Sequence, residues 1–232
     1  MKIETATALV TGANRGLGRA LAAELLARGA TVYATARRPQ TLDLPGARYL
    51  ALDVTDPASV AAAAEAAPDV NLLINNAGTY TGANLLTAEL DQIRLEMDTH
   101  YYGTLATSRA FAPKIAANGG GTILNILSVL SWVAFPGTGA YSAAKSAAWS
   151  LTNALRLSLA EQGVRVAGLH VGYMDTDMAA DVSAPKTAPE AVAKLAVDGI
   201  ADGAYEIVID DVSRTVQAGL SGGVAALYPQ IA

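Results

Sequence analysis

Apolar residues along the chain form two kinds of segment, which alternate over most of its length. The short segments are rich in β-branched residues and predict strands at Thr7–Val10, Thr31–Thr35, Arg48–Leu52, Asn71–Ile74, Thr122–Leu127, Val164–His170 and Glu206–Ile209. The longer segments carry apolar residues at helical spacing and predict helices at Leu17–Arg28, Ala58–Ala67, Leu90–Ala117, Ala140–Gln162 and Pro189–Ala201. Strands that alternate with helices in this way are typical of βαβ units.

The strand segments also indicate how the layers are arranged. Segments such as Leu72-Leu73-Ile74 have no polar alternation, as expected when helices cover both faces of a parallel sheet. We therefore expect an α/β fold of the doubly wound kind, with a seven-stranded, mostly parallel sheet and helices on both faces. Since no repeat or linker-like stretch interrupts the pattern, we expect residues 1–232 to form a single domain.

Composition and charge exclude several classes of function. The chain has 232 residues, of which 52% are hydrophobic, and no cysteine, so disulfide scaffolds, cysteine zinc sites and thiol catalysis are excluded. Its net charge is −5 and no lysine or arginine run offsets it, which disfavours nucleic acid as a partner. No segment reaches the roughly 18 apolar residues of a membrane span, and the first residues lack a secretory signal. We expect a cytoplasmic protein with no metal, no membrane partner and no nucleic-acid partner.

A glycine-rich loop lies between the first predicted strand and the first predicted helix. Glycines here allow a tight turn and a close approach of the backbone to a pyrophosphate, and the N–H groups at the start of the helix attract phosphate. A turn that only needs positive φ angles is the alternative interpretation. The position between strand and helix favours a dinucleotide site, formed by Gly12, Asn14, Arg15, Gly16, Leu17 and Gly18.

Two arginines, Arg37 and Arg38, follow the second predicted strand, and Arg15 lies in the glycine loop. In a dinucleotide site, an acidic residue after this strand holds the ribose hydroxyls, whereas an arginine accommodates a 2′-phosphate. A guanidinium group suits phosphate because it makes paired charge-assisted hydrogen bonds. Solvated surface arginines are the alternative, but the strand-end position favours NADP(H) over NAD(H) as the cofactor.

Tyr141 and Lys145 are four residues apart in a predicted helix, so their side chains share one face. A free tyrosine has a pKa near 10, and we expect the neighbouring ammonium to lower the pKa of Tyr141 towards the working range of an acid–base catalyst. The lysine can also reach the hydroxyls of a bound nicotinamide ribose. The alternative is an amphipathic helix with a packed tyrosine and a lysine whose ammonium reaches solvent.

Taken together, these features resemble a classical short-chain dehydrogenase/reductase (SDR). The resemblance covers residues 5 to about 200 and depends on the order and spacing of several short motifs. These are Thr11-Gly12-x-x-x-Gly16-x-Gly18, Asn75-Asn76-Ala77-Gly78, Ser128, Tyr141-x-x-x-Lys145 and the segment from Gly172 to Thr176. The resemblance implies a Rossmann-type fold and an oxidoreductase in which hydride transfer interconverts an alcohol and a carbonyl.

The resemblance also implies roles on the adenosine side of the cofactor. Asp53 would bond the adenine amino group, with Val54 nearby. Asn75, Ala77 and Gly78 would line the adenosine ribose and steady the central strand. Without the family, Asp53 fits a strand-end cap, and the segment that contains Asn75 fits an ordinary turn after a buried strand.

On the catalytic side, the resemblance implies that Ser128 holds the oxygen of the substrate while Tyr141 donates or accepts the proton. Ser131 lies in the same loop and competes for the role, but the spacing of 13 residues to Tyr141 favours Ser128. Both groups would stabilise the charge on the carbonyl oxygen during reduction. Gly172 is retained at the cofactor side, and Thr176 would contact the nicotinamide carboxamide.

His100 stands where the family usually has an asparagine that holds a water in the proton relay from the lysine to solvent. A histidine can also bond a water, and it titrates near neutral pH. Our hypothesis is that His100 replaces the asparagine in the relay, which would make activity depend on its ionisation. A buried histidine bonded to backbone is the equally weighted alternative.

Two further departures concern the end of the chain and the segment before it. Val171-Gly172 replaces the usual Pro-Gly, which puts little in doubt. The glycine-rich closing strand of the family is replaced by Val212–Leu220, which predicts a short helix. We therefore do not expect the usual tetramer. The resemblance implies a homodimer instead, formed through the helices around Leu105–Ala117 and Ser142–Leu159.

The residues expected around the catalytic face are mostly apolar, although each of them also fits the core. They are Leu130, Trp132, Val133, Phe135, Tyr173, Met174 and Met178. As a group they favour a small apolar carbonyl or alcohol as the substrate. A carbonyl reductase is the leading prediction; the alternatives are a non-catalytic NADP(H)-sensing or signalling protein and an epimerase or dehydratase. The retained tyrosine and lysine disfavour the first alternative, and the lack of a longer substrate segment disfavours the second.

Overall fold

The computed structural model describes residues 1–231, and within them seven strands form one sheet in the order β3-β2-β1-β4-β5-β6-β7. All neighbouring strands in this sheet run parallel. The strands are β1 (Thr7–Val10), β2 (Thr31–Ala36), β3 (Arg48–Ala51), β4 (Leu72–Asn75), β5 (Gly121–Ile126), β6 (Val164–His170) and β7 (Glu206–Val208). The predicted doubly wound Rossmann-type fold is thus confirmed, and the described sheet is wholly parallel.

The helices begin and end close to the predicted positions. They are α1 (Gly16–Ala27), α2 (Pro57–Ala66), α3 (Leu90–Met97), α4 (Thr104–Ala117), α5 (Gly139–Leu159), α6 (Pro189–Asp202), α7 (Asp211–Gly219) and α8 (Gly223–Leu227). In residues 1–231, no helix has both the length and the apolar character needed to cross a bilayer.

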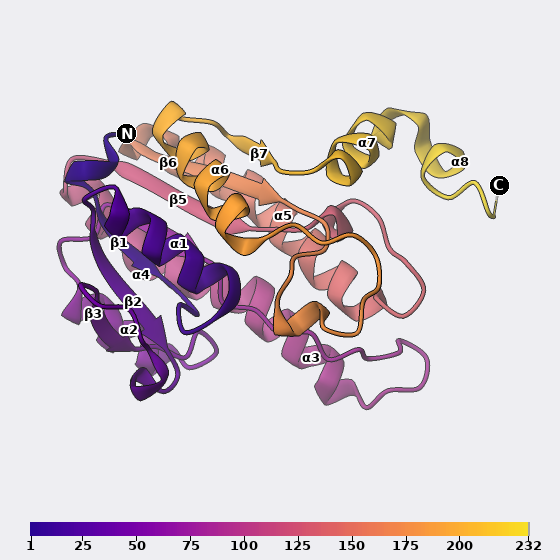
Figure 1. The fold of residues 1–232 in the computed structure, drawn as a ribbon, viewed down its shortest axis with the longest axis horizontal. Coiled ribbons are helices and arrows are strands. Elements are labelled where there is room, and N and C mark those ends of the chain that lie inside the picture. Colours follow the sequence, from indigo (N-terminus) through magenta and orange to yellow (C-terminus); the bar gives the residue numbers. More distant parts are fainter. Residues whose placement is uncertain (232) are drawn as a thin grey trace.

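The helices cover the sheet on both faces, with α1 and α6 on one side and α2, α4 and α5 on the other (Figure 1). Successive side chains of β1 show why its three buried residues are all apolar. Ala8 and Val10 belong to the core beneath α1 and α6, whereas Leu9 belongs to the core beneath α2 and α4. A strand packed on both faces has no side for polar residues.

The segment predicted as one helix from Leu90 to Ala117 contains a change of helical type. Asp98–Gly103 is a π-helical turn, η3, between α3 and α4. Its flanking residues keep right-handed helical angles, so the chain does not turn away. A π turn adds a residue to one turn and changes which side chains face inwards. His100 lies in this turn and is buried.

The end of the chain leaves the sheet after β7. The predicted helix Val212–Leu220 is present as α7, and α7 and α8 extend beyond the sheet (Figure 1). Their apolar side chains pack on the loop that follows β5. The contacts join Val216, Leu227 and Tyr228 to the cluster of Val129, Leu130 and Val133.

The core gives a direct test of the fold. Phe111 on α4 is fully buried, so Phe111→Ala should reduce the free energy of unfolding by about 3–5 kcal/mol, measured by urea denaturation. Leu86→Ala is the control because Leu86 is 93% exposed, and its effect should stay within about 0.5 kcal/mol. Equal effects of the two substitutions would contradict the described packing.

Candidate active site

The glycine loop after β1 is closely packed against the loop after β4. Gly12 and Gly16 have φ angles of 65° and 51°, in the region that favours glycine. A Cβ on Gly12 would lie 3.1 Å from the Cα of Ala77. A Cβ on Gly18 would overlap the carbonyl oxygen of Gly12 and the side-chain amide of Asn76. The loop therefore needs these glycines for its shape and its packing.

Asn76 fastens the glycine loop to the sheet, a role that the sequence analysis did not assign to it. Its side-chain amide donates to the carbonyl oxygens of Thr11 at 2.9 Å and Gly12 at 3.2 Å. The hydroxyl of Thr11 accepts hydrogen bonds from the backbone N–H groups of Asn76 and Ala77. The conformation of the glycine loop is thus set by four hydrogen bonds between the ends of β1 and β4.

The first turn of α1 faces the loop that follows β6. A Cβ on Gly16 would lie 3.2 Å from Cγ2 of Thr176, and Arg15 forms an exposed ion pair of 2.9 Å with Asp177. The side chain of Leu17 is buried in the core, so only its backbone can face a cofactor. Asn14 is half-buried.

The amino end of α1 fits a dinucleotide pyrophosphate. No side chain caps this end of the helix, and a Cβ on Gly18 could not be accommodated in the loop. The free N–H groups of a first helical turn and the positive end of the helix dipole both favour an anion there. The residues present therefore fit the group that the sequence predicts.

Arg37 and Arg38 are exposed directly after β2, and neither forms an ion pair within residues 1–231. Asp53 is half-buried after β3, where its Oδ1 accepts from the backbone and hydroxyl of Thr55. This Asx-type turn is the strand-end cap expected as the alternative role of Asp53. Oδ2 of Asp53 takes no part in the turn. Val54 packs against Gly103 in the π turn.

Asn75 lies inside the sheet and not in the glycine-loop cleft. Its Oδ1 accepts from Thr107 at 2.7 Å, and its amide donates to Asn125 at 2.9 Å and Ser108 at 3.2 Å. These bonds occupy both ends of the buried side-chain amide, and the ribose-lining role expected for Asn75 stays a prediction. Asn75 links β4 to β5 and α4, as expected for a residue that steadies the central strand.

Ser128 and Ser131 form a capping box at the start of a short 3-10 helix, Val129–Ser131. The hydroxyl of Ser131 accepts from the backbone N–H of Ser128 at 3.2 Å and is buried. The hydroxyl of Ser128 accepts from the N–H of Leu130 at 3.1 Å. Both hydroxyls thus have structural partners, since that of Ser128 also donates to the carbonyl oxygen of Val171 at 3.5 Å, and the choice of Ser128 over Ser131 for contact with substrate stays a prediction.

The side chain of His170 contacts the backbone of Ser128. Its Nδ1 is 3.1 Å from the carbonyl oxygen of Ser128, and its ring stacks on Trp132 with centroids 3.7 Å apart. Its Nε2 lies 3.0 Å from Oε2 of Glu206 on β7. The sequence analysis missed His170, because a histidine at the end of an apolar strand carries no motif.

The loop after β6 is held by a second residue without a motif. The backbone N–H of Gly172 donates to Oδ2 of Asp210 at 2.6 Å, and Asp210 also caps α7 by accepting from the N–H of Ser213. One carboxylate thus joins the cofactor-side loop to the C-terminal helix. An acidic residue just after a strand and before a helix is the signal that could have identified it.

Tyr141 and Lys145 lie in the first two turns of α5, with Nζ of Lys145 5.5 Å from the centre of the Tyr141 ring. Lys145 is buried and donates to the carbonyl oxygen of Ile126 at 2.8 Å. Tyr141 is half-buried, and its ring meets those of Tyr80 and His100 edge to face.

The ionisation of this pair differs from the sequence-based expectation. Burial, followed by the charges of Glu96 and Tyr80, raises the pKa of Tyr141 above its usual range. Burial also lowers the pKa of Lys145 to about 8, although Glu96 opposes that change. The expected lowering of the tyrosine pKa by the lysine is therefore wrong for the protein alone, because burial disfavours the charged form of both groups.

His100 is buried between Tyr141 and the loop after β4. Its Nε2 is 2.7 Å from the carbonyl oxygen of Thr79, so the backbone-bonded alternative describes its contacts. Burial and the Lys145 ammonium lower the pKa of His100 well below its ordinary value. A Cβ on Gly78 would lie 2.8 Å from Cε1 of His100, which explains the need for glycine at position 78.

Glu96 is a further buried residue that the sequence analysis missed. It is fully buried at the end of α3, and its Oε1 accepts from the N–H and hydroxyl of Thr81 at 2.7 and 2.8 Å. Its Oε2 has no hydrogen-bond partner among the described residues and lies 3.7 Å from Nε2 of His100. The signal was the i, i+4 spacing of Glu96 and His100 in one helical segment.

The apolar residues expected around the substrate separate into two groups. Leu130 and Val133 are buried under the C-terminal helices, Trp132 stacks on His170, and Met174 packs on the core beneath α1. The others are partly exposed: Phe135, Tyr173 and Met178.

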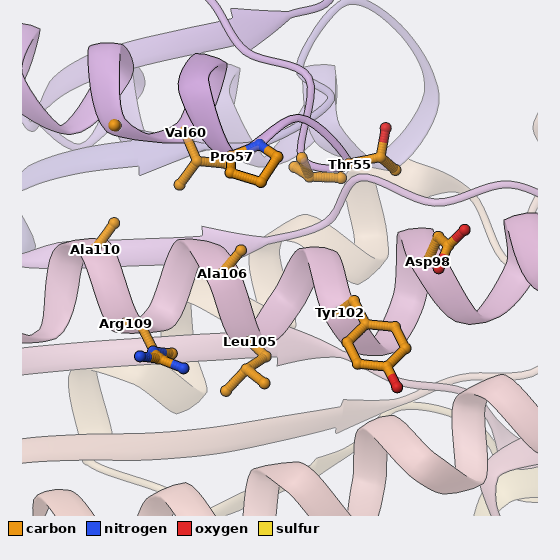
Figure 2. A pocket seen from close by; sticks show the side chains of 11 residues that line it. Thr55, Pro57, Val60, Asp98, Tyr102, Leu105, Ala106, Arg109 and Ala110 are labelled. Atoms are coloured by element: carbon orange, nitrogen blue, oxygen red, sulfur yellow. The ribbon is translucent and has the colours of Figure 1, made fainter.

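A hollow of about 660 Å³ lies elsewhere, between α2 and the helix that runs from η3 into α4 (Figure 2). Its walls include Pro57 and Val60 on one side and Tyr102, Leu105 and Arg109 on the other. None of the catalytic candidates lines it. Its second wall instead belongs to the helix predicted to form a dimer.

Comparisons with known proteins agree with this geometry. The sequence profile of a family described as short chain dehydrogenase matches residues 6–187. The chain superimposes with a TM-score of 0.95 on a short chain dehydrogenase from Burkholderia cenocepacia in complex with NADP, at 38% identity over 100% of this chain and 99% of that chain. The 1-deoxy-11-beta-hydroxypentalenate dehydrogenase of Streptomyces avermitilis is 33% identical over 81% of this chain and 76% of its own length. The NADPH-dependent 1-acyldihydroxyacetone phosphate reductase of Schizosaccharomyces pombe is 34% identical over 72% of this chain, and the match spans 60% of that enzyme.

The packing of the glycine loop can be tested without an enzyme assay. In Gly18→Ala the new methyl group collides with Gly12 and Asn76, so the loop must shift and the affinity for NADP+ should fall about tenfold or more, measured by calorimetry. Gly219→Ala is a control, since its methyl group would meet only ordinary contact with Leu227. Unchanged affinity in Gly18→Ala would contradict the assigned role of the loop.

Proposed function

This chain belongs to the short-chain dehydrogenase family, and from that premise we propose that it is an NADP(H)-dependent oxidoreductase that interconverts an apolar ketone or aldehyde with its alcohol. The observation that carries the proposal is a continuous line of contacts from the glycine loop to the catalytic candidates. Gly12 packs on Ala77, Gly78 packs on His100, and the ring of His100 meets the ring of Tyr141. A cofactor held by the glycine loop would therefore reach the phenol.

In this proposal Ser128 and Tyr141 bond the same substrate oxygen. During reduction the hydroxyl of Tyr141 donates its proton to that oxygen, while the hydroxyl of Ser128 stabilises the growing negative charge. The bound dinucleotide supplies the hydride from its nicotinamide ring. Thr176 would orient the carboxamide of that ring, and its contact with Gly16 places it at the amino end of α1.

In the proposal Lys145 replaces the proton that Tyr141 gives up. Its ammonium lies close enough to the Tyr141 ring to transfer a proton through a hydroxyl or a water. A pKa of about 8 leaves Lys145 largely protonated at neutral pH but able to release its proton. His100 would pass the next proton inwards, in place of the asparagine of the family.

Support for NADP(H) as the cofactor comes from charge and from a relative. Arg37 and Arg38 are exposed at the end of β2, with no acidic residue beside them at the position where one would hold the ribose hydroxyls of NAD. The similar structure from Burkholderia cenocepacia is a complex with NADP.

We also propose a cytoplasmic homodimer formed through α4 and α5. Tyr102 in the π turn before α4 and Leu157 on α5 are large apolar residues, with 57% and 84% of their surfaces exposed. Leu105 and Arg109 line the hollow beside α4 (Figure 2). Such a surface would lose its contact with water in a dimer.

The central test is an NADPH-oxidation screen over aldehydes, ketones and diketones, with Tyr141→Phe measured beside the wild type. Loss of the phenolic proton should reduce kcat by about 100-fold or more, while affinity for NADPH stays within about threefold. NADPH binding by the wild type without turnover of any carbonyl would favour the sensing protein instead. Equal turnover by the two proteins would remove Tyr141 from the mechanism.

The cofactor preference has a separate test. Replacing both arginines, Arg37→Ala with Arg38→Ala, removes the charges proposed to hold the 2′-phosphate. The KM for NADPH should rise about tenfold or more, and the KM for NADH should change little, because NADH lacks that phosphate. Arg94→Ala is a control with an exposed guanidinium group far along the chain on α3. A parallel rise for both cofactors would contradict the assignment.

A further inference from the structure

The buried pair of Glu96 and His100 is not explained by packing. A buried carboxylate that leaves one oxygen without a partner costs free energy, and an apolar residue of similar size would avoid that cost. Oε2 of Glu96 is such an oxygen, and the polar group beside it is the ring of His100 at 3.7 Å. Both side chains are almost completely buried.

The contacts of His100 decide which ring nitrogen carries the proton. A carbonyl oxygen can only accept, so the 2.7 Å contact with Thr79 requires a proton on Nε2. The amide of Thr79 also approaches Nε2, at 3.3 Å, but that contact would need the other tautomer and is the longer of the two. The lone pair of the neutral ring therefore lies on Nδ1. This edge of the ring lies along Gly78, since a Cβ there would be 3.5 Å from Nδ1.

We propose that Glu96 is a positioning residue that orients His100 through its Nε2 side and stabilises the imidazolium when Nδ1 takes up a proton. The inference depends on the proposed function, in which His100 carries protons between Lys145 and solvent. Each reduction removes one proton from Tyr141, and Lys145 replaces it. Nδ1 of His100 then takes up a proton from water and passes it to the neutral amine of Lys145, which returns the ring to its Nε2-protonated form. In the charged state of this cycle the ring has a negative oxygen 3.7 Å away.

The surroundings of the pair explain why a counter-charge is needed. The titratable groups that face it are Lys145 and Tyr141 from α5, and Tyr80 from the loop after β4 meets the ring of Tyr141. Burial disfavours a charge on His100, and Lys145 disfavours it further while it carries its own proton. Thr81 holds Oε1 of Glu96 with two hydrogen bonds, which keeps Oε2 directed towards the ring.

Glu96→Gln tests the proposal with little change of shape. Thr81 needs an acceptor, so the amide oxygen takes the place of Oε1 and the NH₂ group faces the protonated Nε2. We expect kcat to fall about tenfold or more, with KM for NADPH within about twofold, and the ionisation that limits kcat to move to lower pH. Glu96→Asp, which retains the charge, should recover part of kcat. In a His100→Asn background, Glu96→Gln should change kcat less than about twofold; an equal loss in both backgrounds would overturn the proposal.

A spectroscopic measurement separates this proposal from the proposed function. The chain has two histidines, so ¹⁵N–¹H spectra of the imidazole rings contain two sets of signals, and His100→Asn identifies those of His100. We expect the Nε2-protonated tautomer in the wild type, more of the Nδ1-protonated tautomer in Glu96→Gln, and a pKa of His100 lower by about one unit. Identical tautomers and titration in both proteins would overturn the proposal, whether or not the protein turns over a carbonyl. Thermal unfolding of each variant identifies any that fails to fold.

Discussion

The pairing of β1 with β4 positions most of the other features of the site. The two strands are distant in sequence but run parallel, with Val10 opposite Ile74. Their alignment continues beyond the sheet, because Asn76 donates two hydrogen bonds to Thr11 in the loops that follow. Ligands of open α/β sheets bind where the strand order reverses, at the carboxyl ends of such neighbouring strands. The cofactor loop and the loop that covers His100 thus obtain their positions from one strand pair.

Burial is the second constraint, because it disfavours the charged forms of the groups in the site. Tyr141, Lys145, His100 and Glu96 lie in one cluster, and burial shifts the pKa of each towards its neutral form. Within the described residues 1–231 no ion pair neutralises Lys145, whose ammonium donates to a backbone carbonyl oxygen. Burial thus makes Lys145 and His100 release protons more readily, whereas Tyr141 and Glu96 hold theirs more tightly.

The fold could be predicted from local patterns because apolar residues recur at one spacing in strands and at another in helices. The glycine loop, Tyr141 and Lys145 could also be identified as site residues from the sequence, since each belongs to a motif of a few neighbouring residues. The sequence did not assign a role to Asn76, however, because neighbouring residues along an extended chain face opposite sides and the sequence does not say which side is which. His170 and Asp210 were missed for another reason. Each makes a hydrogen bond with a residue at least 38 positions away, which no local motif reveals.

The histidine at position 100 shows how one departure from a family pattern requires others. An imidazole is larger than the side chain of asparagine, and it fits beside the loop after β4 because Gly78 has no side chain there. The ring brings a second nitrogen, and the carbonyl oxygen of Thr79 accepts its proton. It also brings a group that can become charged inside the protein, next to the ammonium of Lys145. Glu96 lies one helical turn before His100. The π turn that follows Glu96 lets both side chains face inwards. A buried imidazole needs space, a hydrogen-bond acceptor and a counter-charge in order to hold a proton. This chain supplies all three within one small region.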